Sequence, residues 1–297
     1  MIIVVSGASG MIGSALVKEL YAAGHQVKRL VRHEVTSDAE ISWDPADGVM
    51  DAAGLDGCDA IINLAGENIA QRWTSAAKRE IRESRVAATS LLARTVASMA
   101  VAPTVVLSGS AIGYYGNRGD ELLDEGSSSG RDFLSTVVQD WEAAAMPIAA
   151  AGVRLVYLRS GLVLSKEGGA LAKMLLPFKL GAGGHMGDGT QWMSWIGLHD
   201  HVNAMIHALT NQGVHGPVNF VTPHPVTNAE FASILGSVLN RPAVVPAPAF
   251  ALKLMFGEMA EGTILSSQRV MPSVLSASGF RFAHPTLQSA LSVLLSG

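Results

Sequence analysis

Short apolar runs alternate with amphipathic stretches along most of the chain. Residues 1–5 and 27–31 are apolar runs of strand length, and residues 14–23 between them have the spacing of an amphipathic helix. The alternation continues through a strand ending at 41–45, a buried strand at 60–66, a helix at 75–100, a strand at 104–107, a helix through 141–150 and a strand at 153–158. Strands that alternate with helices predict an α/β protein with a doubly wound parallel sheet.

A glycine-rich turn joins the first strand to the first helix, with glycine at every third position. The first glycine allows a sharp turn, the second lets a pyrophosphate approach the backbone, and the third lets the helix pack closely on the sheet. The N-terminus of the helix then presents N–H groups and the positive end of its dipole to phosphates. The turn predicts a Rossmann-type dinucleotide site formed by Gly7, Ser9, Gly10, Met11, Ile12 and Gly13.

The end of the second strand distinguishes between the two nicotinamide dinucleotides. An acidic residue there holds the ribose hydroxyls of NAD, whereas an arginine accommodates the 2′-phosphate of NADP. Arg32 occupies this position; Glu34 lies nearby, but Asp38 and Glu40 come too late in the chain. A solvated charge at the strand end is the alternative interpretation of Arg32. We expect NADP(H) to be preferred over NAD(H).

Composition and charge exclude several classes of protein. A chain of 297 residues with 48% hydrophobic residues can bury a large core, and a net charge of -4 with scattered basic residues shows no nucleic-acid-binding surface. Cys58 is the only cysteine, which excludes an intramolecular disulfide and favours a reducing compartment. No apolar stretch approaches the roughly 18 residues that span a bilayer. We expect a cytoplasmic protein without membrane or nucleic-acid partners.

The last third of the chain contains motifs with more than one interpretation. Residues 181–189 are rich in glycine and predict a mobile loop over a substrate cleft, in which His185 is either solvent-facing or an acid–base group. His199 and His201 flank Asp200 in a pattern that suggests metal ligands, but Asp200 is better interpreted as the N-cap of a helix over 202–209. We therefore predict no metal site.

A proline-rich segment suggests where the chain divides. Residues 242–248 predict a joint between a first domain, residues 1–241, and a small, mostly helical C-terminal lobe, residues 242–297. Trp192 in the first domain packs the substrate-binding part or stacks on a ligand.

The glycine spacing and several further motifs resemble one enzyme superfamily. Gly-x-x-Gly-x-x-Gly, in place of Gly-x-Gly-x-x-Gly, is similar to the extended branch of the short-chain dehydrogenases/reductases. Other segments resemble atypical extended members, described as NAD-dependent epimerase/dehydratase-like proteins of unassigned reaction with a small appended C-terminal domain. These segments cover nearly the whole chain: residues 63–68, 108–116, 141–142, 158–164, 168–171, 191–196, 216–219, 226–231 and 250–282.

The resemblance implies further cofactor-binding residues. Glu67 and Arg72 follow the fourth strand, where they either line the nicotinamide half of the site or form an exposed ion pair. Trp43 and Asp44 are expected against the adenine, unless Asp44 only caps a turn before Pro45. The cofactor-binding residues implied at the ends of the fourth and fifth strands are Leu64, Ala65, Gly66, Glu67, Arg72 and Ser108.

The resemblance supplies only part of the catalytic machinery. Ser110 matches the catalytic hydroxyl of the superfamily, or caps its loop, and Tyr114 or Tyr115 either reaches the substrate or packs under the loop. The superfamily also uses a Tyr-x-x-x-Lys pair, in which lysine lowers the tyrosine pKa for proton transfer. Counted back from Glu142, these two positions hold Leu134 and Val138. The usual proton-transfer pair is therefore missing.

The sequence and this resemblance leave two classes of function open. The first is an NADP(H)-binding oxidoreductase or epimerase-like protein acting on a small polar or sugar-like substrate. The second is a non-catalytic NADP(H)-binding sensor that passes the state of the cofactor to a partner. The resemblance also implies a homodimer, paired through the helices after the fourth and fifth strands.

Overall fold

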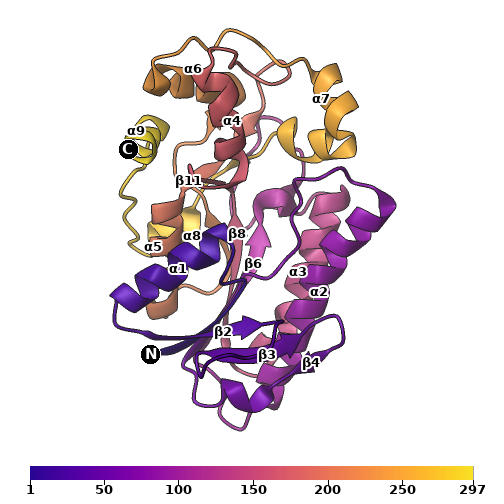
Figure 1. The fold of residues 1–297 in the computed structure, drawn as a ribbon, viewed down its shortest axis with the longest axis vertical. Helices are drawn as coiled ribbons and strands as arrows, with labels where there is room; N and C mark the ends of the chain where they lie inside the picture. The colour runs from indigo at the N-terminus through magenta and orange to yellow at the C-terminus, as the bar shows by residue number, and fades with distance from the viewer. Residues whose placement is uncertain (297) are drawn as a thin grey trace.

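The computed structural model, which describes residues 1–296, has an eight-stranded sheet at its centre (Figure 1). The strand order is β12-β8-β6-β5-β1-β2-β3-β4, and all neighbours are parallel except β3 and β4. The predicted doubly wound Rossmann fold is thereby confirmed. The strands are β1 (Ile2–Ser6), β2 (Gln26–Val31), β3 (Glu40–Asp44), β4 (Val49–Met50), β5 (Ala60–Asn63), β6 (Val105–Ala111), β8 (Arg154–Ser160) and β12 (Gly216–Phe220).

Two pairs of helices cover the two faces of this sheet (Figure 1). Ile3 and Val5 of β1 share a core with α1 (Met11–Ala22) and α5 (Leu198–Thr210). Val4, which points to the opposite face, packs in the core that contains side chains of α2 (Ser75–Ser98) and α3 (Phe133–Ala150). Both faces are buried, which is why the parallel strands are almost continuously apolar.

The start of α1 differs from the predicted one. The helix begins at Met11 rather than Ser14, because the turn before it is tight. The Gly10 N–H donates to the Gly7 carbonyl at 3.1 Å, and the Ser14 N–H donates to the Gly10 carbonyl at 2.8 Å. The glycine turn therefore leads directly into the first helical turn.

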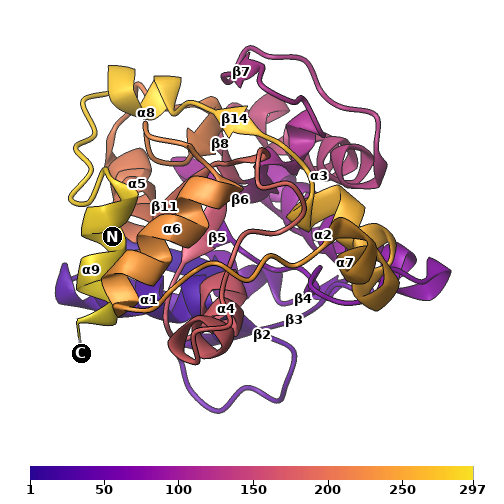
Figure 2. The ribbon, with the colours of Figure 1, turned by 90° about the horizontal axis from the view of Figure 1, so that it is seen from above.

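A second group of elements lies beyond the carboxyl ends of the strands (Figures 1 and 2). Its core combines α4 (Gly169–Lys179), α6 (Asn228–Leu239) and α9 (Leu287–Leu295) with the fully buried Trp195. The remaining short elements are η1 (Ala52–Leu55), η2 (Ile112–Tyr115), β7 (Leu122–Leu123), β9 (Leu162–Leu164), β10 (Trp192–Met193), β11 (Trp195–Gly197), β13 (Val226–Thr227), α7 (Ala249–Phe256), η3 (Ala260–Ile264), β14 (Arg269–Val270) and α8 (Ser273–Ala277).

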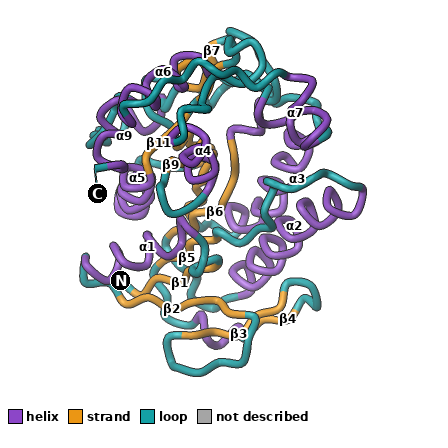
Figure 3. Tube along the Cα trace, turned by 45° about the horizontal axis from the view of Figure 1, so that its top comes forward, coloured by secondary structure: helices purple, strands orange, loops and turns teal. Residues whose placement is uncertain are grey.

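The C-terminal residues pack among elements from earlier in the chain. After α6, a loop leads to α7 (Figure 3), β14 pairs in parallel with β7, and α9 shares the core of α4 and α6. A domain boundary near residue 242 stays a prediction.

Two expectations about the last third of the chain are wrong. Asp200 does not cap a helix at 202, because α5 begins earlier, with Gly197 at its N-cap; the buried Asp200 carboxylate accepts the N–H groups of Ala283 and His284, both at 2.9 Å. Residues 181–189 are not loosely held, since they exchange backbone hydrogen bonds with Val245 and Ala247.

Candidate functional site

The glycine turn lies where the strand order reverses, between β1 and β5. Gly7 has φ +65°, and a Cβ there would come within 2.7 Å of the Leu64 carbonyl oxygen at the end of β5. A Cβ on Gly13 would overlap the Gly7 carbonyl, whereas one on Gly10 would stay 3.4 Å from the same oxygen. Gly7 and Gly13 are therefore required by backbone packing. Gly10 leaves the space in front of α1 open to a ligand, at the crevice where open α/β sheets bind cofactors.

The N-termini of two helices meet at this turn. No side chain caps α1 at Gly10 or α4 at Gly168, so the first N–H groups of both helices are not used by side-chain caps. Met11 joins the two helices, because its Sδ lies 3.2 Å from the position of a Cβ on Gly168. The contact between α4 and the turn was not predicted. The glycine pair that precedes an apolar helical stretch was its only signal in the sequence.

Arg32 lies just after β2 and is exposed. Within residues 1–296 its guanidinium has no hydrogen bond or ion pair, so it is available to a ligand. The neighbouring Arg29 is instead paired with Glu40 at 2.9 Å. Hydrogen bonds from Thr36, together with the charge of Arg29, lower the pKa of Glu40, which is therefore committed to local contacts.

Trp43 and Asp44 lie at the end of β3, the strand next to β2. Trp43 is buried in the core of α2 and α3. Asp44 Oδ1 accepts the N–H groups of Ala46 at 2.9 Å and Asp47 at 3.4 Å, so it caps the following turn. A contact between Asp44 and adenine stays a prediction.

Leu64 and Ala65 are fixed to β1 by a serine that sequence analysis missed. Their N–H groups donate to Ser6 Oγ at 3.0 and 3.2 Å, and Ser6 donates to Asn63 Oδ1 at 2.6 Å. Both polar side chains are fully buried at the crevice. They hold the end of β5 against the glycine turn.

A half-buried arginine supports the turn after β5. Arg85 Nη2 donates to the Glu67 carbonyl at 2.9 Å, and its guanidinium carbon lies 3.2 Å from the position of a Cβ on Gly66. Burial lowers the pKa of Arg85 to about 10. The alternative ion pair between Glu67 and Arg72 is absent from the described residues, and Arg72 is exposed.

Ser110, near the end of β6, belongs to a buried ionic network. Its hydroxyl donates to Glu142 Oε1 at 2.6 Å, and Arg159 donates to the two oxygens of the same carboxylate at 2.8 and 2.9 Å. Burial acts to lower the pKa of Arg159, but the hydrogen bonds and charge of Glu142 outweigh it and raise this pKa. Ser108, two residues earlier, is buried, and its hydroxyl has no partner within residues 1–296.

The two tyrosines of η2 pack on this network. Tyr115 is fully buried, as predicted for a residue under the loop; its hydroxyl donates to Asn219 at 2.7 Å and accepts from Arg159 at 3.1 Å. Burial raises the pKa of Tyr115 to about 12, so its phenol stays protonated. The half-buried Tyr114 places its ring centre 3.5 Å from the Arg159 guanidinium carbon. Of the two tyrosines, Tyr114 is the one that a ligand can reach.

The positions of the missing Tyr-x-x-x-Lys pair face the same turn. Leu134 and Val138 of α3 have carbon atoms 3.5 and 3.8 Å from the position of a Cβ on Gly113. Apolar packing therefore occupies the place of the usual proton-transfer pair.

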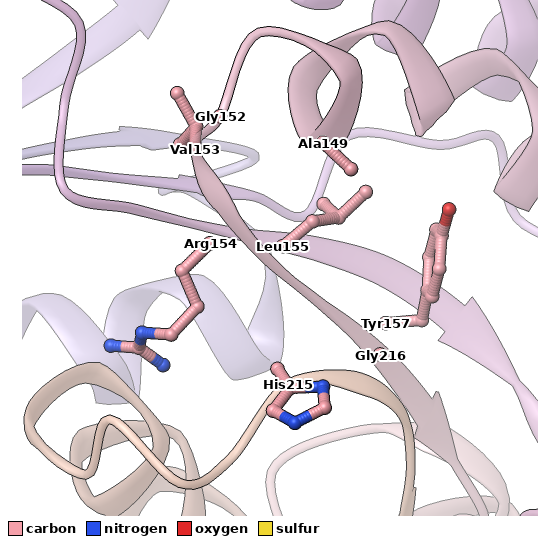
Figure 4. Close-up of a pocket in the computed structure, with 8 residues that line it drawn as sticks. All are labelled: Ala149, Gly152, Val153, Arg154, Leu155, Tyr157, His215 and Gly216. Carbon is pink, nitrogen blue, oxygen red and sulfur yellow. The ribbon is translucent and has the colours of Figure 1, made fainter.

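Two cavities, of about 480 and 580 Å³, lie at the opposite end of the sheet. Both are lined by Gly152 and Arg154, where β8 begins, and Figure 4 shows Tyr157 and His215 beside the first of them. Arg154 there donates to the carbonyls of Ala208, Leu209 and Val214. These cavities are separate from the glycine turn and from Ser110.

The surroundings of His201 are not those of a metal ligand. It is fully buried, its Nε2 lies 2.8 Å from Ser160 Oγ, and burial lowers its pKa to about 4. Among the described residues, no group of three or more His, Cys, Asp or Glu side chains is arranged to hold a metal ion. None of the described helices has the length and hydropathy needed to cross a membrane.

Comparison with known proteins gives matches over the whole chain. A model of the "NAD dependent epimerase/dehydratase family" matches residues 3–220, and a "Domain of unknown function (DUF1731)" matches residues 247–294. Epimerase family protein Mb2239 of Mycobacterium bovis is 43% identical over 98% of this chain and 96% of its own length. Human epimerase family protein SDR39U1 is 39% identical, with 98% of each chain covered.

One solved structure of a relative contains a nicotinamide cofactor. The crystal structure of human SDR39U1 (isoform 2) with NADPH superimposes with a TM-score of 0.92 at 37% identity and covers 100% of both chains. The predicted resemblance, including the appended C-terminal segment, is thereby confirmed.

Proposed function

Since the chain belongs to the NAD dependent epimerase/dehydratase family, we propose that it is an NADP(H)-dependent oxidoreductase or epimerase-like enzyme acting on a small polar or sugar-like substrate. The observation that carries this proposal is the combination of the glycine turn with an unpaired Arg32 at the end of β2. The human relative, whose crystal structure contains NADPH, supports the same choice of cofactor.

The residues that would hold NADP(H) follow from the geometry of the turn. Gly10 and the N-terminus of α1 would bind the pyrophosphate, and the guanidinium of Arg32 would bind the 2′-phosphate. Leu64 and Ala65 at the end of β5 would lie beside the nicotinamide half. When bound, the cofactor supplies or accepts a hydride.

Ser110 would provide a hydrogen-bond acceptor in the substrate site. Its only proton is directed to Glu142, so the oxygen offers lone pairs to a ligand and would accept a hydrogen bond from a substrate hydroxyl. Tyr114, whose ring is held against Arg159, is the nearest phenol that a substrate can reach and would exchange the proton. This assignment replaces the missing Tyr-x-x-x-Lys pair with Tyr114 of η2.

Calorimetric titration with NADPH, NADP, NADH and NAD tests the cofactor assignment. We expect selective binding of the two phosphorylated dinucleotides. If none of the four binds, the glycine turn is only structural and the proposed function is wrong. A protein that binds NADPH is then screened for NADPH consumption with carbonyl compounds and nucleotide sugars.

The packing of Leu134 and Val138 favours a second candidate function, a non-catalytic NADP(H) sensor. The variant Tyr114→Phe separates the two, because phenylalanine keeps the ring against Arg159 and removes only the hydroxyl. An enzyme should lose turnover while its NADPH affinity stays unchanged. A sensor should show no turnover before or after the substitution.

We further propose a cytoplasmic homodimer, formed through α2 and α3. Light scattering coupled to size-exclusion chromatography measures the mass in solution. The variant Arg82→Glu then tests the surface, since Arg82 of α2 is partly exposed and pairs with Asp140 of α3.

A further inference from the structure

Arg269 of β14 is a half-buried cation that lacks a counter-ion. Within residues 1–296, its guanidinium makes no hydrogen bond and no ion pair, and its Nε is fully buried without a partner. Arginines in nearby segments differ in this respect: Arg118 donates to both oxygens of Glu121 at 2.8 and 2.6 Å, and Arg159 is paired with Glu142. A desolvated donor without an acceptor is costly, so an unpaired guanidinium of this kind needs a physical reason.

The indole of Trp192 fixes the orientation of Arg269. The guanidinium carbon lies 4.2 Å from the ring centre, which is the spacing of a cation stacked on an aromatic face. Trp192 is held in turn, because its N–H donates to Asp120 Oδ1 at 2.7 Å. The Asp120 carboxylate therefore binds the indole, and it forms no ion pair with Arg269. Stacking therefore fixes the position of the guanidinium N–H donors but gives them no hydrogen-bond acceptor.

The segment that carries Arg269 packs against η2, the turn that carries Tyr114. β14 lies beside β7 (Figure 2), and the preceding Gln268 donates to the carbonyls of Ile112 at 3.0 Å and Gly116 at 3.1 Å. These two residues bracket Tyr114. A ligand held by Arg269 would thus be bound from the segment that rests directly on η2.

We propose that the Arg269–Trp192 pair is an anion subsite, which binds an oxyanion group of the substrate, a phosphate or a carboxylate. A guanidinium presents parallel N–H donors that match the two oxygens of such a group, and this charge-assisted pairing would satisfy the unpaired donors. This inference rests on the proposed function and narrows its substrate class to anionic compounds.

The test uses the full-length protein loaded with NADPH, so that the phosphate-binding groups of the cofactor site are occupied. Inorganic pyrophosphate and malonate are titrated separately as probes of the two oxyanion types. The variants are Arg269→Ala and Arg281→Ala; the second removes an exposed arginine from the same C-terminal segment and serves as the matched control. We expect saturable binding of at least one probe that is weakened tenfold or more in Arg269→Ala and unchanged in Arg281→Ala.

Selective binding of pyrophosphate would support a phosphate-bearing substrate, and selective binding of malonate a carboxylate-bearing one. No saturable binding of either probe, or equal affinity in wild type and Arg269→Ala, would overturn the proposal. NADPH affinity, measured in parallel, should be the same in both variants and shows that each is folded. If wild type fails to bind NADPH, the cofactor proposal fails, and the same comparison of variants on unloaded protein still decides the anion subsite.

Discussion

Replacing Glu142 by alanine should destabilise the protein strongly, because it leaves a buried charge without its partner. The side chains of Glu142 and Arg159 are only 12% and 4% exposed, and two hydrogen bonds of 2.8 and 2.9 Å join them. Breaking a buried pair from one side costs about 3–5 kcal/mol. Ser110 also loses its acceptor. This loss is a large part of the roughly 5–15 kcal/mol by which such domains are stable.

The double variant Glu142→Leu with Arg159→Met tests whether the stability lost in Glu142→Ala comes from the unpaired charge of Arg159 or from lost packing. Removing both charges leaves the Ser110 hydroxyl without its acceptor, at a cost of about 1–3 kcal/mol at most, whereas the Tyr115 hydroxyl keeps its hydrogen bond to Asn219. The free energy of unfolding, measured by urea denaturation, should therefore fall less in the double variant than the losses in Glu142→Leu and in Arg159→Met added together. A loss below about 1 kcal/mol in Glu142→Ala, or strict additivity in the cycle, would refute the coupling between Glu142 and Arg159.

Three further predictions concern the cofactor and pH. Arg32→Ala should weaken NADPH binding by about 1.5–3 kcal/mol, as for a charged hydrogen bond, and leave NADH binding nearly unchanged; an equal loss in calorimetry for both would contradict the assignment. Gly13→Ala should lower thermal stability and NADPH affinity because its Cβ would overlap backbone, whereas Gly197→Ala, with nothing within 4 Å, is the control. Burial lowers the pKa of His201 in the folded protein from 6.5 to about 4. As the pH falls, the unfolded state therefore takes up a proton on this histidine before the folded state does. Stability should be complete above pH 6.5 and fall as the pH drops toward 4; His201→Phe should flatten this dependence in urea unfolding, and the exposed His215→Phe should not.

Local patterns were sufficient to predict the fold and the glycine turn. Each glycine acts on neighbours within a few residues or on the adjacent strand, and the apolar strands mark the sheet directly. Asp200 was misassigned because its partners, Ala283 and His284, are distant in sequence, and nothing near it distinguishes a buried acceptor from a helix cap. The loop at 181–189 was judged from its glycines alone, whereas residues 245–247 hold it.

The Glu142–Arg159 network explains how the site keeps its shape without the usual Tyr-x-x-x-Lys pair. In the superfamily that pair joins α3 to the reacting centre, and here Leu134 and Val138 leave only packing at those positions. The network restores a polar link one helical turn further on, because Glu142 joins α3 to β6 through Ser110 and to β8 through Arg159. Since this link commits the Ser110 proton, the proposed enzyme would exchange protons through another group, and the ring of Tyr114 lies against the same guanidinium. The proposed enzyme and the proposed sensor would therefore differ at that one hydroxyl rather than at the cofactor site, which both functions need.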